Sequence, residues 1–182
     1  EGVLVAASAV IAPDGAGWLL VGEASSGKST TAAHLVTAGW GYLADEEVLL
    51  HAGNGGSVWL EGWPRALPLD GVWPYGRPTA SGAGRARAGE PSGLARSRWR
   101  RTAPLAGIVS TELAPDLPTL LTRATPDEAL ASLVRATPWL LADSTSTRYE
   151  LGLLRSATRA PGWRLRLGRD THGDVARLAK CM

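Results

Sequence analysis

The chain has 182 residues, 45% of them hydrophobic, which is enough for one domain with a substantial core. Its apolar runs are too short for a membrane span or a signal peptide. The single cysteine, Cys181, excludes an internal disulfide framework and a cysteine-based zinc site, which is typical of a cytoplasmic protein. The chain starts at Glu1 inside an apolar run, so we expect that an N-terminal portion is missing.

The hydrophobic pattern predicts strands interrupted by a few helices, in a single domain over residues 1–182. In chain order we expect strands over 3–11 and 17–21, a helix over 30–38, a strand over 42–44, a hairpin of 48–50 with 57–60, a strand over 106–113, helices over 126–135 and 146–157, a strand over 163–167 and a closing helix over 174–180. The helix at 126 is predicted by a capping box, Thr125-Pro126-Asp127-Glu128, with proline at its first position. The balance of elements indicates an α/β domain that is rich in strands.

One segment matches the phosphate-binding loop (P-loop) pattern G-x-x-x-x-G-K-[ST] without a mismatch, and its residues are Gly22, Glu23, Ala24, Ser25, Ser26, Gly27, Lys28 and Ser29. Its glycines allow backbone N–H groups to turn toward phosphate oxygens. Lys28 would reach the β- and γ-phosphates, and the Ser29 hydroxyl is a hard ligand suited to Mg²⁺. These eight residues and Thr30 are therefore the predicted ATP-binding set.

The surroundings of the loop agree with the motif. A buried strand is predicted directly before it and a helix directly after it, which would aim the positive end of the helix dipole at the phosphates. The chain holds only two lysines, Lys28 and Lys180, although arginine is abundant. A lysine has thus been kept at the position where the loop needs a compact point charge.

Acidic residues follow the next predicted strand. Asp45, Glu46 and Glu47 come after residues 42–44, at the carboxyl end of a strand, where ligands of α/β domains usually bind. A phosphoryl-transfer enzyme needs acids near the phosphates to hold Mg²⁺ and to orient or deprotonate the nucleophile. Asp45 lies nearest to the strand end, and Glu47 is expected to be only part of a charged turn.

A basic segment occupies the middle of the chain. Seven arginines and one acid, Glu90, fall between Arg77 and Arg101, in a stretch rich in Gly, Ala, Pro and Ser. We interpret residues 77–101 as a mobile insertion that is solvated, with closure on an anionic substrate or nucleotide as the sharper alternative. Nucleic-acid binding is disfavoured, because Trp99 is the only aromatic residue nearby and the net charge is only +2.

These motifs resemble a known family. The P-loop, followed by Gly39-Trp40-Gly41-Tyr42-Leu43-Ala44-Asp45-Glu46, is similar to the HPr kinase/phosphorylase family and its standalone relatives, in which a P-loop and a helix precede G-[HWF]-x-L-[VA]-A-D-D. Gly62-Trp63-Pro64-Arg65-Ala66-Leu67 resembles a G-x-P-R-x-L segment of those relatives, and Ala6–Val10 resembles their H-A-S-A-V strand. The resemblance covers most of the chain and is strongest over 17–47.

The resemblance implies a strand-rich P-loop domain related to phosphoenolpyruvate carboxykinase rather than to Ras. It implies transfer of the γ-phosphate of ATP, with Mg²⁺, to a hydroxyl of a peptide or protein, commonly a serine. The standalone relatives include kinases that tailor lasso peptides. Asp45 matches the general base, Glu46 stands with Ser29 at the metal, and Arg65 and Arg101 are candidates for stabilising charge on the transferring phosphoryl group. A homo-oligomer is a further expectation.

Three positions depart from the family pattern. Ala6 stands where a histidine is expected, Glu46 replaces an aspartate, and Ala24-Ser25 replaces Ser-Gly. These departures leave two alternatives open: a weakly active or inactive ATP-binding regulatory or partner protein, and an NTP hydrolase. The chain has no counterpart of the family's C-terminal regulatory motifs, so recognition of HPr itself is not expected. It also lacks a guanine-reading N/T-K-x-D segment, which favours ATP.

Overall fold

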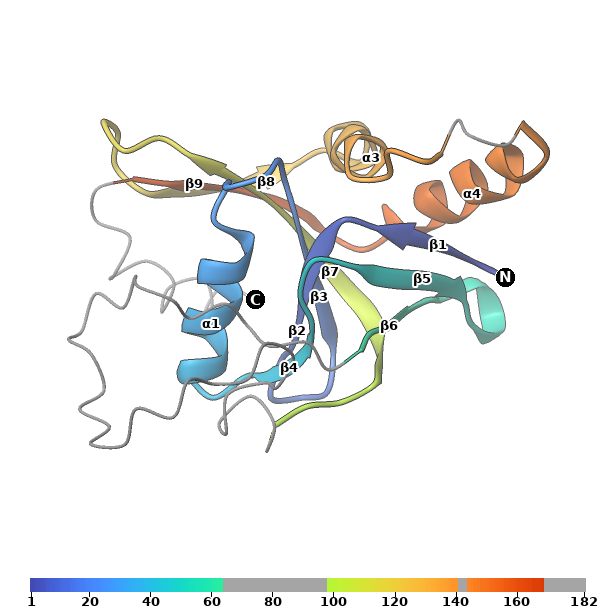
Figure 1. Ribbon diagram of the computed structural model, residues 1–182, viewed down its shortest axis with the longest axis horizontal. Coiled ribbons are helices and arrows are strands. Elements are labelled where there is room, and N and C mark those ends of the chain that lie inside the picture. The colour runs from blue at the N-terminus through green and yellow to red at the C-terminus, as the bar shows by residue number, and fades with distance from the viewer. Residues whose placement is uncertain (64–97, 141–143, 169–182) are drawn as a thin grey trace.

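The computed structural model describes residues 1–63, 98–140 and 144–168, and its strands form one bent, mixed sheet (Figure 1). The strand order is β1-β5-β6-β7-β3-β2-β4, with β9 also paired to β7 and β8 paired to β9. The strands are β1 (Gly2–Val5), β2 (Ala7–Ile11), β3 (Gly17–Val21), β4 (Gly41–Ala44), β5 (Val48–Ala52), β6 (Val58–Glu61), β7 (Thr102–Leu113), β8 (Leu120–Ala124) and β9 (Gly162–Leu167). The helices in the described ranges are α1 (Lys28–Thr37), α3 (Pro126–Arg135), α4 (Ser144–Ala157) and the short 3₁₀ turn η1 (Asn54–Gly56).

The long strand β7 joins the two halves of the sheet. Its first residues pair antiparallel with β6, whereas its later residues run parallel to β3 on one side and to β9 on the other. Val21, the last residue of β3, lies opposite Ser110 of β7 and Ala7 of β2. Since β2 also pairs antiparallel with β4, the carboxyl ends of β3 and β4 meet at the same edge.

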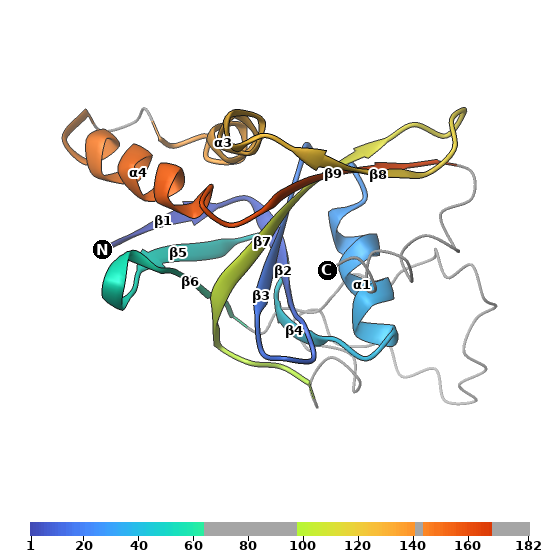
Figure 2. The same ribbon diagram turned by 180° about the vertical axis from the view of Figure 1, so that it is seen from behind.

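Two apolar clusters sandwich the central strands, which explains why these strands are apolar at successive positions. In β3, Leu19 and Val21 belong to one cluster, and Trp18 and Leu20 belong to the other. The second cluster is closed by α1, and the first by α3 and α4, so helices cover both faces of the sheet (Figures 1 and 2). This arrangement holds the end of β3, where the P-loop begins, between two packed layers.

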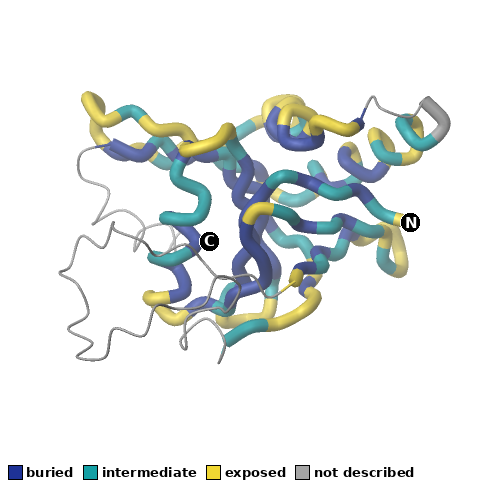
Figure 3. The backbone as a smooth tube through the Cα atoms, viewed as in Figure 1, coloured by how far each residue is buried: buried dark blue, intermediate teal, exposed yellow. Residues whose placement is uncertain are grey.

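Burial is concentrated in the centre of the sheet, as Figure 3 shows in dark blue. The turn from β7 to β8 is exposed, and Leu113, Leu117 and Leu120 in or beside it are each about half exposed. Within the described ranges, no helix is both long enough and apolar enough to cross a membrane.

Most of the expected elements are present, with their ends moved by a few residues. The hairpin of β5 with β6 is confirmed, as is the helix that begins at the Thr125 capping box. The strand expected over 3–11 is wrong as one element, because the N–H of Ala6 donates to the carbonyl of Ala136 and the sheet is interrupted there. β8 was not expected; all of its residues are partly or fully exposed, so it carries no alternating pattern. The closing helix over 174–180 and most of the 77–101 insertion lie outside the described residues.

Candidate nucleotide-binding and catalytic site

The P-loop connects β3 to α1 through backbone conformations that require its glycines. Gly22 has a φ of 154° and Gly27 a φ of 94°, both in the region that side chains disfavour. A Cβ on Gly27 would come within 2.2 Å of Leu167 Cδ1. Ser25 also has a positive φ, 61°, without being glycine, so the loop holds backbone strain of the kind that gathers at binding sites.

The first turn of α1 has no side chain that satisfies its N–H groups. Gly27 caps the helix without a side-chain hydrogen bond, and no acidic residue lies in the first turn. The N–H groups and the positive end of the helix dipole are therefore available to an external anion. This arrangement fits the predicted binding of phosphate.

Lys28 bends back over the loop that precedes it. Its Nζ donates to the carbonyl oxygens of Gly22 at 2.9 Å and of Glu23 at 2.7 Å. Partial burial lowers the pKa of Lys28, and the negative charge of Asp45 acts in the opposite direction. The ammonium group thus lies at the start of the loop and within the electrostatic influence of Asp45.

Asp45 directly follows β4 and is 2% exposed. Its Oδ1 accepts hydrogen bonds from Ser8 Oγ and, at 2.9 Å, from Ser29 Oγ. Its Oδ2 is buried and has no hydrogen-bond partner among the described residues. A buried carboxylate oxygen without a partner is costly, so this atom is the strongest sign that Asp45 faces a ligand or a reacting group.

The Ser29 hydroxyl fits a magnesium ion. Ser29 donates its hydroxyl hydrogen to Asp45, which leaves the oxygen lone pairs of Ser29 for a metal, and Glu46, the residue after Asp45, is the carboxylate predicted to share that metal. Glu46 is exposed and has a φ of 72°, and its carbonyl oxygen accepts a hydrogen bond from the N–H of Ala7. No cluster of three His, Cys, Asp or Glu side chains suited to a metal occurs in the described part of the chain.

Ser8 is a site residue that sequence reasoning did not single out. It belongs to β2, every residue of which is buried, and it lies 37 positions from Asp45 in the chain. Two sequence signals could have found it: a hydroxyl inside the apolar segment Ala7–Ile11, and the serine of the H-A-S-A-V strand that this segment resembles. Ala6, where a histidine was expected, precedes this strand at its break from β1.

The two predicted arginines are not brought to the loop by the described contacts. Arg101 precedes β7 at the end opposite to the P-loop, and its guanidinium bonds to Glu61 Oε1 at 2.9 Å and 2.8 Å. Its backbone carbonyl accepts from the N–H of Gly62, which packs on Leu43 and Ala44 just before Asp45. Arg65 lies outside the described residues. The catalytic roles of both arginines remain predictions.

A cleft of about 640 Å³ opens beside the P-loop, on the side of β7 and α3. Its polar and charged lining includes Glu23, Ser110, Glu128, Ser132, Arg135 and Arg164. Sequence reasoning missed this cleft, because its walls come from four segments that lie far apart in the chain. No local motif marks Arg135 or Arg164.

Comparison with known proteins supports the fold. No protein-family model and no curated protein matches the chain. Among solved structures, the HPr(Ser) kinase/phosphatase from Coxiella burnetii is similar over 97% of this chain and 91% of its own, with a TM-score of 0.52 and 13% sequence identity. The fold is therefore an HPr-kinase-like P-loop fold, as the sequence motifs predicted. At this identity the likeness concerns the fold alone.

Proposed function

We propose that this protein is an ATP-dependent kinase that transfers the γ-phosphoryl group to a hydroxyl of a peptide or protein. The observation that carries the proposal is Asp45, whose Oδ1 is held by Ser8 and Ser29 while its buried Oδ2 has no hydrogen-bond partner in the described part of the chain. A P-loop alone is compatible with many reactions. Beside this P-loop, however, lies a carboxylate oxygen without a hydrogen-bond partner among the described residues, and such an oxygen is suited to receive the proton of an acceptor hydroxyl.

In the proposed reaction, the acceptor oxygen forms a bond to the γ-phosphorus, and the bond from that phosphorus to the β,γ-bridging oxygen breaks. The bridging oxygen keeps the electron pair and leaves as part of ADP, and the acceptor's proton passes to Asp45 Oδ2. Lys28 and the amides of the first turn of α1 would stabilise the phosphate charge. Ser29 and Glu46 would hold Mg²⁺, which supplies further charge stabilisation.

Serine-containing peptides are the first acceptors to test, with ribosomally made peptides such as lasso peptides among them. The support is the motif resemblance described above together with the HPr-kinase-like fold. We propose further that the protein acts in the cytoplasm. The identity of the acceptor depends on the experiment below.

The test is the intact mass of such acceptors after incubation with the protein, ATP and Mg²⁺. Asp45→Asn keeps the shape and the carbonyl oxygen of the side chain, but it removes the proton acceptor. We expect transfer to fall by about 10²- to 10⁴-fold while ATP binding stays within a few-fold. Asp14→Asn, in an exposed turn where Asp14 accepts a hydrogen bond from the N–H of Ala16, is the matched control and should behave as the wild type.

Other results would change the proposal. If Asp45→Asn also abolishes ATP binding, Asp45 acts at the phosphates and is not the proton acceptor. If ATP turns over without an acceptor, well above a Lys28→Ala control, the protein is an NTP hydrolase. If no acceptor gains a phosphate while ATP is bound, the kinase proposal fails.

A second candidate function is an ATP-binding regulatory protein without transfer activity. The observation that favours it is Ala6, which stands where a histidine is expected at the break between β1 and β2. The next residue, Ala7, bonds through its N–H to the carbonyl of Glu46, so this break lies beside the acidic segment. Ala6→His separates the two candidates, because only a protein that has lost chemistry would gain transfer from it.

A further inference from the structure

The cleft beside the P-loop has two unlike walls. One wall consists of the start of the loop and the end of β7, and it includes the acids Glu23 and Glu112. The other wall is one side of α3, where Arg135 lies, with Arg164 of β9 beside it. A volume of about 640 Å³ lies within the range of small-molecule sites and admits a short peptide segment or a nucleoside.

The position of Lys28 indicates which end of the nucleotide the cleft faces. The P-loop lysine reaches the β- and γ-phosphates, and here its Nζ bonds to the carbonyls of Gly22 and Glu23, both of which line the cleft. The negative charge of Asp45 also acts on Lys28. The γ-phosphate end is therefore expected between Asp45 and the mouth of the cleft, which is where an acceptor must approach.

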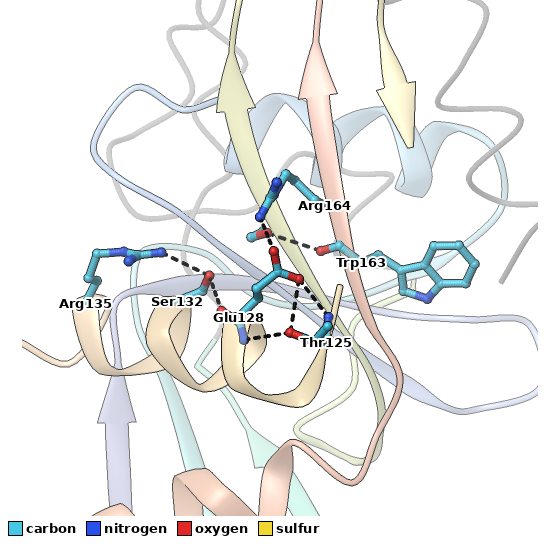
Figure 4. A network of polar contacts seen from close by, with 7 residues as sticks. Thr125, Glu128, Ser132, Arg135, Trp163 and Arg164 are labelled. Atoms are coloured by element: carbon cyan, nitrogen blue, oxygen red, sulfur yellow. Dashed lines mark hydrogen bonds and ion pairs between the residues drawn. The ribbon is translucent and has the colours of Figure 1, made fainter. Parts of the chain in front are cut away.

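The α3 wall is fixed before any ligand arrives. Thr125 and Glu128 satisfy each other's backbone N–H groups, and the second oxygen of Glu128 accepts from Arg164 of β9 at 2.7 Å (Figure 4). Ser110 of β7 in turn donates to the carbonyl of Trp163, the residue before Arg164. These contacts tie α3 to β9 and β9 to β7. A preformed wall lowers the entropy cost of binding.

Among the residues that the structure describes, Arg135 is the cation of this wall that has no carboxylate partner. Arg164 is paired with Glu128, whereas Arg135 bonds only to the Ser132 hydroxyl, at 3.3 Å, among the described residues (Figure 4). An arginine of this kind binds carboxylates through two parallel N–H groups. Glu23 and Glu112 on the facing wall repel a negative charge, so they would direct it toward α3.

We propose that this cleft binds the acceptor peptide and that Arg135 binds an acidic side chain close to the acceptor hydroxyl. The inference rests on the proposed kinase function and adds a substrate class to it: hydroxyl-bearing peptides with a neighbouring Asp or Glu. Arg135 is assigned a role in specificity, not in the phosphoryl transfer.

The test uses the full chain and two serine peptides that differ only in Glu or Gln at positions flanking the serine. In the wild type, the KM of the Glu peptide should be at least about tenfold below that of the Gln peptide, as expected for a hydrogen bond between charged groups. In Arg135→Ala this preference should disappear, with the Kd for ATP within about twofold of the wild type. Arg135→Lys should keep part of the preference, because the charge remains.

Arg155→Ala is the matched control. Arg155 lies in the last turn of α4 as Arg135 lies in the last turn of α3, so both variants lose one positive charge at the same kind of helix position. Arg155 does not line the cleft. Arg155→Ala should therefore leave the preference for the Glu peptide unchanged. An equal loss of preference in both variants would assign the effect to net charge and overturn the inference.

Equilibrium binding separates this inference from the proposed function. The same peptides are titrated into the protein loaded with a non-hydrolysable ATP analogue. Tighter binding of the Glu peptide that depends on Arg135 supports the cleft, even if no phosphate is transferred. Equal binding of the two peptides to the wild type overturns the inference while leaving a kinase intact. Loss of analogue binding in Arg135→Ala would show that the cleft holds the nucleoside instead.

Discussion

The helices α1 and α3 begin in opposite ways. At α3, Thr125 accepts from the N–H of Glu128, Glu128 accepts from the N–H of Thr125, Pro126 has no N–H to satisfy, and the first turn holds two acids. At α1, Gly27 is in the left-handed conformation, no side chain caps the helix, and the first turn holds no acid. The N-terminus of α3 is therefore capped by its own side chains, whereas the N-terminus of α1 has no side-chain cap.

This difference indicates that the N-terminus of α3 is structural, whereas the N-terminus of α1 is suited to binding an anion. Internal caps stabilise a helix by about 1 kcal/mol, so their omission costs stability unless something else occupies the N–H groups. Phosphate is the natural occupant, since it carries the charge that the helix dipole favours. The uncapped start of α1 is thus consistent with selection for binding at the expense of the stability of the free protein.

Thr30→Glu gives the sharpest test of this comparison and should have the largest effect. Thr30 is the third residue of α1, the position that Glu128 holds in α3, so the variant supplies α1 with an acid of its own. We expect ATP to bind at least about tenfold more weakly, because the carboxylate repels phosphate and competes for the same N–H groups. Calorimetric titration with ATP and Mg²⁺ measures the change.

Thr30→Gln is the control for this variant, since it matches the size of Glu without the charge. Because it lacks the negative charge, it should recover most of the loss of ATP affinity, at least about tenfold, that is expected for Thr30→Glu. The free energy of unfolding of free Thr30→Glu should be equal to that of the wild type or higher by about 0.3–1 kcal/mol. Equal ATP affinities for the two variants would show that a charge at the start of α1 does not affect ATP binding. The N-terminus of α1 would then not be the phosphate site.

The local parts of the site were predictable from sequence. The loop, its flanking strand and helix, and the capping box are each at most 10 consecutive residues long and follow rules of local geometry. The position of Asp45 beside the P-loop was also predictable, because this residue directly follows the strand after the P-loop helix. The uncapped start of α1 follows from the same eight residues that defined the motif.

The parts that depend on tertiary contacts were not predictable. Ser8 reaches Asp45 only because β2 lies between β3 and β4 in the sheet. No local pattern in the segment Ala7–Ile11 predicts that strand order. The break at Ala6 depends on a hydrogen bond to Ala136, 130 positions away. β8 is exposed and has no alternation, so it is recognisable only by its pairing with β9.

Thr125→Ala tests the capped start of α3. It should have a smaller effect, and it should change stability alone. Removing the capping hydroxyl should lower the free energy of unfolding by about 1 kcal/mol, within the range of about 0.5–2 kcal/mol for such caps. Urea unfolding measures it, and the affinity for ATP should not change. Thr122→Ala, at an exposed position of β8, is the control. A large loss of ATP affinity in Thr125→Ala would mean that α3 supports the nucleotide directly.

The smallest effect is a pH dependence that belongs to α3. The backbone N–H of Thr125, then its hydroxyl, and then Arg164 favour the ionised form of Glu128 and hold its pKa below the ordinary value of 4.5. A carboxyl with a lowered pKa in the folded state stabilises that state at pH values above the unfolded pKa. This contribution is lost as the pH falls through the lower, folded pKa.

Glu128→Gln should therefore be less stable than the wild type at pH 7, and the two should converge as the pH falls below 4.5 and through the lower, folded pKa of Glu128, where the wild-type carboxyl becomes protonated. Urea unfolding at a series of pH values measures this convergence. A constant difference at every pH would assign the loss to the shape of the side chain rather than to its charge. Convergence would show that the charge at the start of α3 comes from the chain itself, whereas the first turn of α1 has no acid that can titrate in this range and depends on phosphate for its negative charge.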